Sequence, residues 1–251
     1  MPITRNDIVA RLKAAFEPNP KVYAFWLEGS DSLGSVDKYS DLDIWFDVED
    51  GHEQKIMKEV ERVLKTLAPL DLVYHYNHSD PKIIQEHLHI KGTSEFLLLD
   101  ICIQSHSRKA KFTKEMTHEL PFPIFDKTKI TKLYSLNQKA VNKEIAARVE
   151  HLRLEVAQSS RVKKYILRGQ FLESWVYYNR WILGPLVELL RIKYAPLTRD
   201  MGLVHISNYL PKKELKQLES LYQVKSVKDI GTKSKKALQM CNSLLKVLCK
   251  N

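Results

Sequence analysis

Two aspartates set two residues apart, Asp41 and Asp43, join a polar, glycine-containing segment to an apolar run, and they constrain the fold of this chain most strongly. The apolar pattern predicts a strand over residues 41–48, and residues i and i+2 of a strand point to the same face. The two carboxylates therefore lie side by side, where they repel each other unless a cation compensates them. Hard oxygen ligands of this kind suit Mg²⁺, so the pair predicts a magnesium site.

The segment before the pair, residues 29–40, contains two glycines and four serines and follows an apolar run at 22–27. Backbone N–H groups and hydroxyls in such a turn bind phosphate oxygens. Gly29 lets the backbone approach a phosphate, and Gly34 allows either close packing or a positive φ. Together with the aspartates, the segment predicts a metal-dependent phosphate site. The alternative is a polar surface loop followed by a strand that carries a solvated aspartate pair.

Periodicity predicts a sheet with helices in the first half of the chain. We expect helices at 4–16 and 53–67 and strands at 22–27, 41–48, 70–76 and 95–104, whereas 83–90 fits either a strand or a short helix. Asp100 interrupts the apolar residues of the last strand, where a charge is costly unless it is paired or bound to metal. This order of elements is typical of an α/β or α+β fold with a mixed sheet.

The pattern changes after Pro121-Phe122-Pro123 from strands to long helices, which we expect at 130–158, 161–178, 181–194, 212–222 and 232–250. We therefore predict an α+β chain, with a mixed-sheet domain at 1–125 and an all-helical bundle at 126–251. The aromatic residues at helical spacing in this second half are expected mainly in its core. A few of them are candidates for a binding pocket: Phe171, Trp175, Tyr177, Tyr178, Trp181 and Tyr194.

The charge of the chain favours anionic ligands such as nucleotides or nucleic acid, because 40 Lys and Arg face 30 Asp and Glu. A scattered, solvated lysine surface is the alternative, and only Arg161–Lys164 and Lys233–Lys236 form clusters. No apolar run approaches the roughly 20 residues that span a bilayer. The three cysteines are odd in number and widely spread, and the start lacks a secretory signal. We expect a cytoplasmic protein without membrane contact.

The residues Gly29-Ser30, Gly34 and Ser40-Asp41-Leu42-Asp43 resemble the G-S-x-x-x-G-x(5)-S-D-x-D signature of the DNA polymerase β-type nucleotidyltransferase superfamily. The aminoglycoside and lincosamide nucleotidyltransferases belong to that superfamily. Every signature position is present, with a strand expected on each side. The helical half resembles only generally the helical domain of the drug-modifying members.

The resemblance implies roles for the signature residues. Asp41 and Asp43 would hold Mg²⁺, expected as two ions about 4 Å apart. Ser30 would contact the triphosphate of ATP or another nucleoside triphosphate, and Gly29 and Ser40 complete the expected nucleotide-binding set. The superfamily also needs a third carboxylate, as a metal ligand or as a base towards the acceptor hydroxyl. Asp100 is the first candidate for it, and Asp71, at the start of another strand, is the second.

The expected activity is transfer of a nucleoside monophosphate, AMP from ATP, onto a hydroxyl of a small molecule, with release of pyrophosphate. An aminoglycoside or lincosamide antibiotic is the acceptor class that the resemblance implies, and antibiotic resistance would be the associated role. The basic helical half counts against a polycationic aminoglycoside. The alternatives are a nucleic-acid- or protein-directed nucleotidyltransferase and a non-catalytic, antitoxin-like module of the same fold. No feature indicates an oligomeric state.

The remaining polar residues of the first half carry weaker expectations. Asp31, Asp37 and Asp47 are expected to be solvated or to cap turns. The histidines of two expected strands could hold zinc, but they lack partner cysteines, so exposed imidazoles are the favoured interpretation: His75, His78, His87 and His89. In the helical half, Lys164 and Arg168 are candidates for contacts with nucleotide phosphates, and Glu173 for a contact with a cationic acceptor.

Overall fold

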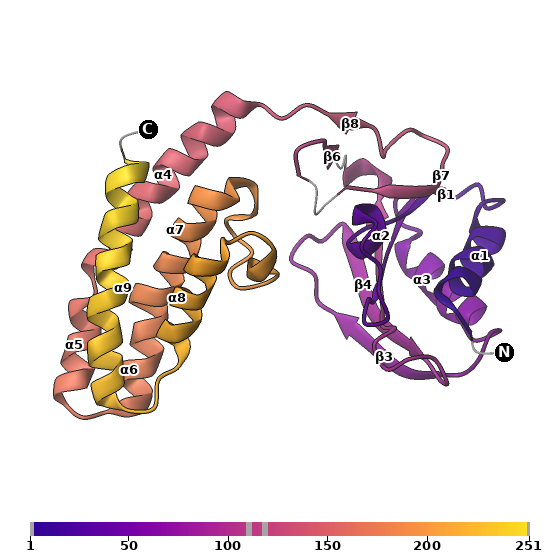
Figure 1. Cartoon of the computed structure of the whole chain (residues 1–251). Coiled ribbons are helices and arrows are strands. Elements are labelled where there is room, and N and C mark those ends of the chain that lie inside the picture. Colours follow the sequence, from indigo (N-terminus) through magenta and orange to yellow (C-terminus); the bar gives the residue numbers. More distant parts are fainter. Residues whose placement is uncertain (1–2, 109–111, 117–119, 250–251) are drawn as a thin grey trace. The chain divides into compact units, whose positions relative to one another are not determined.

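The computed structural model describes residues 3–108, 112–116 and 120–249. The chain divides into two compact units, Met1–Leu136 and Asn137–Asn251, which Figure 1 draws in indigo to magenta and in pink to yellow. Each unit has its own cluster of buried apolar side chains. Among the described residues, no helix combines the length and apolarity needed to cross a bilayer.

The first unit is built on a six-stranded sheet in the order β3-β4-β5-β2-β1-β7. The central strands β2 and β5 run parallel, and the other neighbouring strands are antiparallel. The predicted mixed sheet and α+β class are confirmed, and residues 83–90 form a strand. The strands are β1 (Val22–Leu27), β2 (Leu42–Val48), β3 (Leu70–Tyr76), β4 (Ile83–Ile90), β5 (Leu99–Ser105) and β7 (Phe122–Asp126).

Two helices and one face of the sheet form the core of the first unit. Helices α1 (Arg5–Phe16) and α3 (Glu53–Leu64) contribute Ile8, Leu12 and Val60, which are fully buried. The even-numbered residues of β2 join this core, because strand side chains alternate between the faces of a sheet. The odd-numbered residues, which include Asp43, therefore lie on the opposite face.

That opposite face holds a smaller aromatic cluster next to the aspartates. The Trp26 and Trp45 rings stack with their centroids 5.8 Å apart, and Phe112 packs edge-on against Trp26. Phe112 belongs to a two-stranded parallel sheet made of β6 (Phe112–Thr113) and β8 (Leu133–Tyr134). A short helix, α2 (Ser30–Leu33), and a 3₁₀ turn at His106–Arg108 complete the unit.

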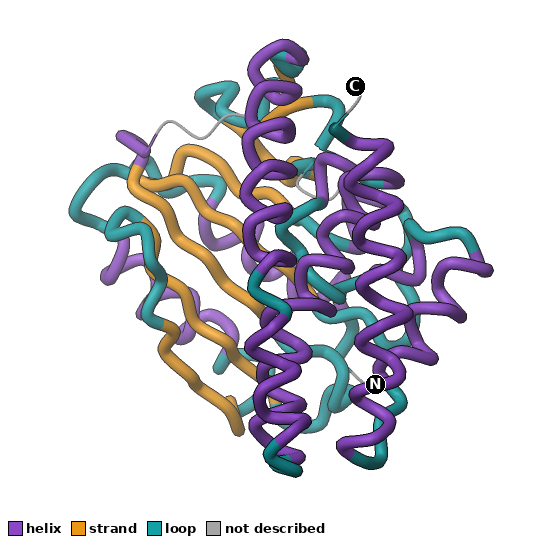
Figure 2. The backbone as a smooth tube through the Cα atoms, turned by 90° about the vertical axis from the view of Figure 1, so that its left-hand side faces the viewer, coloured by secondary structure: helices purple, strands orange, loops and turns teal. Residues whose placement is uncertain are grey.

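The second unit is all helical, and Figures 1 and 2 show its helices lying alongside one another. Leu186, Leu189 and Leu190 on one side and Ala237 and Cys241 on another are fully buried in its core. The unit contains α4 (Gln138–Ala157), α5 (Ser160–Leu167), α6 (Phe171–Tyr178), α7 (Gly184–Tyr194), α8 (Lys212–Tyr222) and α9 (Val227–Leu248), a π-helical segment η3 (Asn179–Leu183), and 3₁₀ turns at Pro196–Thr198 and Ile206–Asn208.

Several predicted boundaries differ from the structure. The division between the units follows Leu136 rather than residue 125, because Phe125 lies in edge strand β7 and packs into the first core. The helix expected from 130 begins at Gln138, since residues 133–134 pair with β6. The helix expected over 161–178 is two helices, because Gly169 takes a left-handed conformation (φ 70°) that ends α5.

Smaller shifts have local causes. Helix α3 ends at Leu64 rather than at residue 67, where turns formed by Thr66 and Leu67 replace it. The strand expected from 95 begins at Leu99, because a turn bonds the Leu97 N–H to the Ser94 carbonyl. Trp181 lies in the π-helical segment before α7 rather than in a regular helix.

Candidate active site

The sheet brings the predicted carboxylates together. Asp43 of β2 and Asp100 of β5 are direct partners across the parallel pair, and Asp41 immediately precedes β2. Asp71, the second candidate for a third carboxylate, lies on edge strand β3, which β4 and β5 separate from β2. The sheet order therefore places Asp100, and not Asp71, beside the aspartate pair.

Asp43 is the electrostatic centre of this group. Burial, and after it the negative charges of Asp41, Asp100 and Asp31, raise its pKa to about 6 against the opposing effect of Arg5. Burial also raises the pKa of Asp31, against the opposing effect of Arg5. Four carboxylates thus share one partly buried region, which a bound cation would stabilise.

Asp100 is held from the strand beyond it. The Gln85 side-chain amide donates to both Asp100 oxygens, at 2.8 and 3.0 Å, and His87 Nε2 lies 3.6 Å from Oδ2. Both partners come from β4, where residues two apart share a face. Nothing local in the sequence marks Gln85 except that Gln85, His87 and His89 are polar residues two apart.

The glycine at the start of the signature is required by its contact with Asp43. Gly29 has φ 61°, and a Cβ atom there would lie 2.1 Å from Asp43 Oδ2. We expected the Gly29 backbone to approach a phosphate. In the structure it lies against the Asp43 carboxylate instead. Gly34 also has a positive φ, 63°, but a Cβ there would meet nothing within 4 Å. Backbone conformation alone explains glycine at that position.

The two serines of the predicted nucleotide set differ. Ser30 Oγ is buried and has no hydrogen-bond partner within the described part of the chain, so it is available to a ligand oxygen. The Ser40 hydroxyl is used inside the loop: it accepts from the Asp37 N–H at 2.9 Å and donates to the Asp37 carboxylate at 3.1 Å. Asp37 caps this turn, as expected, because it also accepts from the Tyr39 N–H.

Arg5 holds both ends of the segment 29–43, which we call the signature loop. Its guanidinium donates to the carbonyls of Ser40, at 3.0 Å, and of Asp41, and it forms an ion pair with Asp31. Asp31 is therefore paired rather than solvated. Arg5 could not be recognised from the sequence, because its partners lie 26 to 36 residues away and nothing in the pattern of α1 marks it.

Asp47, expected to be solvated or capping, is fully buried. It accepts a hydrogen bond from Gln104 at 2.8 Å and lies 2.6 Å from His106 Nδ1. Burial raises the pKa of Asp47, and these two partners lower it. Asp47 lies on the same face as Asp43 but four residues further along β2, where it stabilises the packing of β2 on β5.

The oxygen atoms of the three aspartates are of the kind that binds Mg²⁺. Asp41, Asp43 and Asp100 supply only carboxylate oxygens, and Mg²⁺ is typically bound by one or two carboxylates together with water and substrate phosphates. Over the ranges that the structure describes, no group of three or more His, Cys, Asp or Glu side chains, these aspartates included, is placed to hold a metal ion by itself. The open, repulsive carboxylate group therefore fits a magnesium ion that binds together with a nucleotide.

The four histidines considered for zinc each contact a different partner. His75 Nδ1 lies 2.8 Å from Glu86, His89 Nδ1 lies 2.6 Å from Asp71, and His78 accepts from the Asp80 N–H. His87 faces Asp100 and stacks on Tyr76 with a centroid distance of 5.9 Å. His87 therefore belongs to the carboxylate site, together with the exposed tyrosines of β3.

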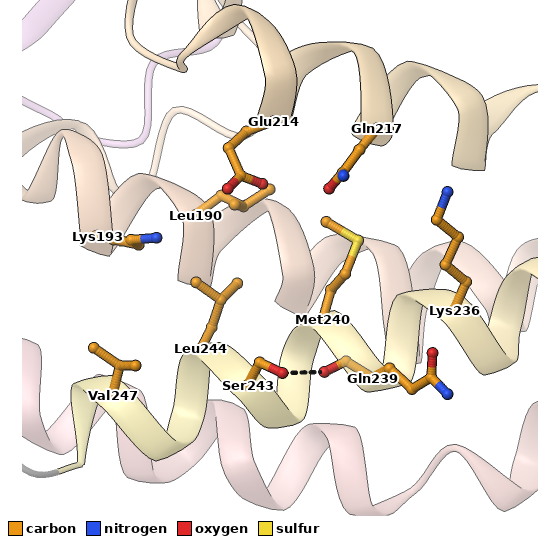
Figure 3. Close-up of a pocket in the computed structure, with 10 residues that line it drawn as sticks. All are labelled: Leu190, Lys193, Glu214, Gln217, Lys236, Gln239, Met240, Ser243, Leu244 and Val247. Atoms are coloured by element: carbon orange, nitrogen blue, oxygen red, sulfur yellow. Dashed lines mark hydrogen bonds between the residues drawn. The ribbon is translucent and has the colours of Figure 1, made fainter.

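The helical unit contains a separate cavity of about 400 Å³ between α7, α8 and α9 (Figure 3). Leu190, Met240 and Leu244 form its apolar part, and Glu214 and Gln217 point into it from α8 (Figure 3). None of the residues predicted from the sequence to bind nucleotide or metal lines this cavity.

Comparison with known proteins gives structural likeness only. No protein-family model matches the sequence, and no curated protein matches it. An aminoglycoside 6-adenyltransferase from Bacillus subtilis is 14% identical, with 96% of this chain and 88% of the other covered and a TM-score of 0.33. A nucleotidyltransferase-like protein from Exiguobacterium sibiricum is 11% identical, with 97% and 75% covered and a TM-score of 0.39.

A third solved structure is the CdnE cyclic dinucleotide synthase of Elizabethkingia meningoseptica, with GTP and Apcpp. It is 17% identical, with 95% of this chain and 89% of the other covered, and its TM-score is 0.30. At these scores the likenesses do not decide function, which is inferred below from the site itself.

Proposed function

We propose that this chain is a Mg²⁺-dependent nucleotidyltransferase that moves a nucleoside monophosphate, AMP from ATP, onto a hydroxyl group and releases pyrophosphate. One observation carries the proposal: Asp43 and Asp100 are in register on two parallel strands with Asp41 beside them, and their mutual repulsion contributes to the raised pKa of Asp43. A structural role would not require carboxylates to be concentrated in this way. Perturbed carboxylates at a strand end are typical of functional sites.

In the proposed reaction the acceptor oxygen attacks the α-phosphorus, and the bond from that phosphorus to the pyrophosphate oxygen breaks. Bound Mg²⁺ would stabilise the charge on the attacking and leaving oxygens. Asp41 and Asp43 would hold it. Asp100, oriented by Gln85, would accept the proton of the acceptor hydroxyl or ligate the metal. The unpartnered Ser30 hydroxyl would donate to the triphosphate.

The acceptor is proposed to be neutral or anionic. Residues 137–251 contain 22 Lys and Arg against 9 Asp and Glu, and this charge repels a polycation such as an aminoglycoside. A small molecule of the lincosamide type, with antibiotic resistance as the role, is the first candidate. A nucleic-acid acceptor is the second, and the same positive charge favours it. A cytoplasmic location follows from the ATP donor.

A pyrophosphate-release assay tests the transfer. The wild-type chain would be incubated with each of the four nucleoside triphosphates, Mg²⁺, and a panel of lincosamides, aminoglycosides and RNA oligonucleotides. Asp43→Asn is expected to lower the rate at least about 100-fold, because metal-ion and electrostatic stabilisation of a transition state is worth several kcal/mol. Asp50→Asn removes the same charge from the exposed turn after β2 and serves as the matched control, with a rate within about twofold of wild type.

The proposal also makes a binding prediction that needs no acceptor. Calorimetry is expected to show Mg²⁺-dependent ATP binding in the wild type and its loss in Asp41→Asn and Asp43→Asn. If the wild type released no pyrophosphate and both variants bound ATP and Mg²⁺ as the wild type does, the chain would be a non-catalytic module.

A further inference from the structure

The two units carry opposite charge balances. Residues 1–136 contain 18 Lys and Arg against 21 Asp and Glu, whereas residues 137–251 contain 22 against 9. The positive charge of the whole chain therefore comes from the helical unit. A basic unit attached to an acidic one indicates an anionic partner for the basic unit.

Part of this charge is concentrated on α5 with its C-cap residue, beside the end of α6 and η3, in what we call the α5–α6 patch: Arg161, Lys164, Tyr165, Arg168, Tyr177 and Trp181. Cations and rings alternate in it at short distances. Lys164 Nζ lies 4.7 Å and Arg168 Cζ 5.6 Å from the centroid of the Tyr165 ring. Arg161 Cζ lies 5.2 Å from the Trp181 ring.

The tyrosines join the two helices of the patch. The Tyr165 and Tyr177 rings lie 4.6 Å apart, one from each helix. The hydrogen bond with Tyr165 raises the pKa of the Tyr177 hydroxyl, and the charges of Lys164 and Arg161 oppose this shift. Both cations therefore act on the same pair of rings. The rings are half-buried, while the three cations are exposed.

Carboxylates do not neutralise the patch. In the described ranges, Arg161, Lys164 and Arg168 form no ion pair within 4.0 Å, whereas Glu150, Glu155 and Glu188 pair with arginines or a histidine elsewhere in the unit. An uncompensated cluster of like charges is unfavourable without a ligand. The patch is thus poised to bind an anion.

Two kinds of partner would use exposed cations and rings: a single-stranded nucleic acid and an anionic membrane surface. A membrane surface needs apolar side chains that project outward from the same face. Leu172, Trp175 and Val176, which are exposed on α6, lie 100° or more around the helix from Tyr177, because each residue turns about 100° around the axis. This leaves Leu167, at the end of α5, as the single exposed apolar side chain beside the patch on the two helices, both of which the structure describes in full. Alternating cations and rings instead match the alternating phosphates and bases of a nucleic-acid strand.

We propose that the α5–α6 patch binds single-stranded nucleic acid, with phosphates on Arg161, Lys164 and Arg168 and bases stacked on the rings and guanidinium planes. Single strands are favoured over duplexes because only unpaired bases expose their faces to such rings. This binding does not depend on the proposed nucleotidyl transfer. If the transfer acts on a nucleic-acid acceptor, the patch would be its docking surface.

Fluorescence anisotropy with labelled oligonucleotides of about 20 nucleotides tests the proposal, with separate RNA, DNA and duplex arms. The triple variant Arg161→Gln, Lys164→Gln, Arg168→Gln is expected to bind at least about tenfold more weakly at moderate salt. Its slope of log affinity against log salt should fall by about 2, since each phosphate contact on a single strand contributes about 0.7. The RNA and DNA arms distinguish the two sources of the strand.

The matched control is the triple variant Lys212→Gln, Lys213→Gln, Lys216→Gln on α8, which removes the same charge outside the patch. It should bind within about threefold of the wild type, because diffuse charge contributes weakly compared with direct phosphate contacts. Tyr177→Ala should weaken binding about tenfold and Tyr177→Phe much less, because stacking needs the ring and not the hydroxyl. Thermal melts would show that each variant is folded.

Three results would overturn the proposal. The first is no binding of any oligonucleotide by the wild type at about 50 mM salt. The second is an equal loss of affinity in the two triple variants, which would indicate diffuse charge only. The third is patch-dependent binding to phosphatidylserine vesicles without oligonucleotide binding. None of them would affect pyrophosphate release with a small-molecule acceptor or Mg²⁺-dependent ATP binding, so failure of this proposal is distinguishable from failure of the proposed function.

Discussion

At the scale of single residues, the candidate site contains a charge that destabilises the folded chain. Asp43 is partly buried among three other carboxylates, and its pKa is raised to about 6. Such a group stabilises the fold only while it is protonated. Natural chains keep unfavourable charges of this kind mainly where a ligand or a reaction uses them.

The first residue-scale prediction concerns pH. The folded pKa of Asp43 lies above its unfolded value, so its contribution to stability is complete below about pH 4 and is lost as the pH rises through about 6. Asp43→Asn should therefore be more stable than the wild type at pH 8, by at most about 3 kcal/mol. Below about pH 4 the difference should vanish. Urea unfolding at several pH values measures it.

The effect of Mg²⁺ on stability should differ between the wild type and Asp43→Asn. Added Mg²⁺ should raise the melting temperature of the wild type at pH 8 and leave that of Asp43→Asn almost unchanged, because ligand binding stabilises only the form that binds it. A variant less stable than the wild type at pH 8 would show that Asp43 has a structural role instead.

The second residue-scale prediction compares the two signature glycines. Gly29→Ala and Gly34→Ala each place Cβ at a positive φ, which costs about 1–2 kcal/mol. Only Gly29→Ala also forces an atom against Asp43 Oδ2, at 2.1 Å. We expect similar backbone strain in both variants, and loss of Mg²⁺-dependent ATP binding in Gly29→Ala alone. Calorimetry and urea unfolding separate the two effects, and equal ATP affinities would contradict this role of Gly29.

At the scale of elements, α1 is connected to the signature loop by one side chain. Arg5 contacts the carbonyls of Ser40 and Asp41 and the carboxylate of Asp31, so it holds the loop on both sides of Gly34. Helix α1 itself is fixed by its Thr4–Asp7 capping box and by its buried leucine and phenylalanine. The loop is thereby attached to a rigid element, which keeps the aspartate pair in place.

Arg5→Ala should therefore loosen the loop without unfolding the unit. Hydrogen exchange is expected to speed up over residues 30–42, and the free energy of unfolding to fall by about 2 kcal/mol, as for loss of hydrogen bonds to a charged group. Arg5→Lys keeps the charge but cannot reach all three acceptors, so it should restore little protection. Arg11→Ala, at an exposed position of the same helix, is the control. Unchanged exchange in Arg5→Ala would show that the loop is held by its internal turn alone.

At the scale of the whole molecule, two cores of different construction share one chain. The first unit extends past the predicted boundary, because β7 pairs with β1 and Asp126 accepts hydrogen bonds from Thr131 and from the N–H groups of Ile130 and Thr128. These contacts connect residues 122–131 to the sheet. The helical unit holds most of the positive charge, and the acidic unit holds the candidate active site.

The boundary at residue 136 and the one predicted at residue 125 lead to different expectations for the stability of an isolated first unit. A fragment of residues 1–136 should unfold cooperatively, because it contains a complete core. A fragment of residues 1–125 loses Asp126 and strand β8, so its free energy of unfolding should be lower by about 2 kcal/mol or more. Urea denaturation of the two fragments measures this difference. Equal stabilities would place the boundary at residue 125.

Features that depend on neighbours in the chain could be predicted from the sequence alone. Short apolar runs identified β1, β2 and β3, and the 3.6-residue period identified the helical half. The signature spacing selected Gly29, Ser30, Asp41 and Asp43. Asp100 stood out as a single charge within an otherwise apolar strand. Each of these conclusions needs only the geometry of a single element.

The tertiary structure decided everything that depends on partners far apart in the chain. The sheet order put Asp100, and not Asp71, beside Asp43, and it buried Asp47 against Gln104. Arg5 found its partners 26 to 36 residues away, and β7 joined the sheet across about 100 residues. Local periodicity carries no information about which strands pair. That choice follows from the packing of the whole core, and it completes the site around the two aspartates.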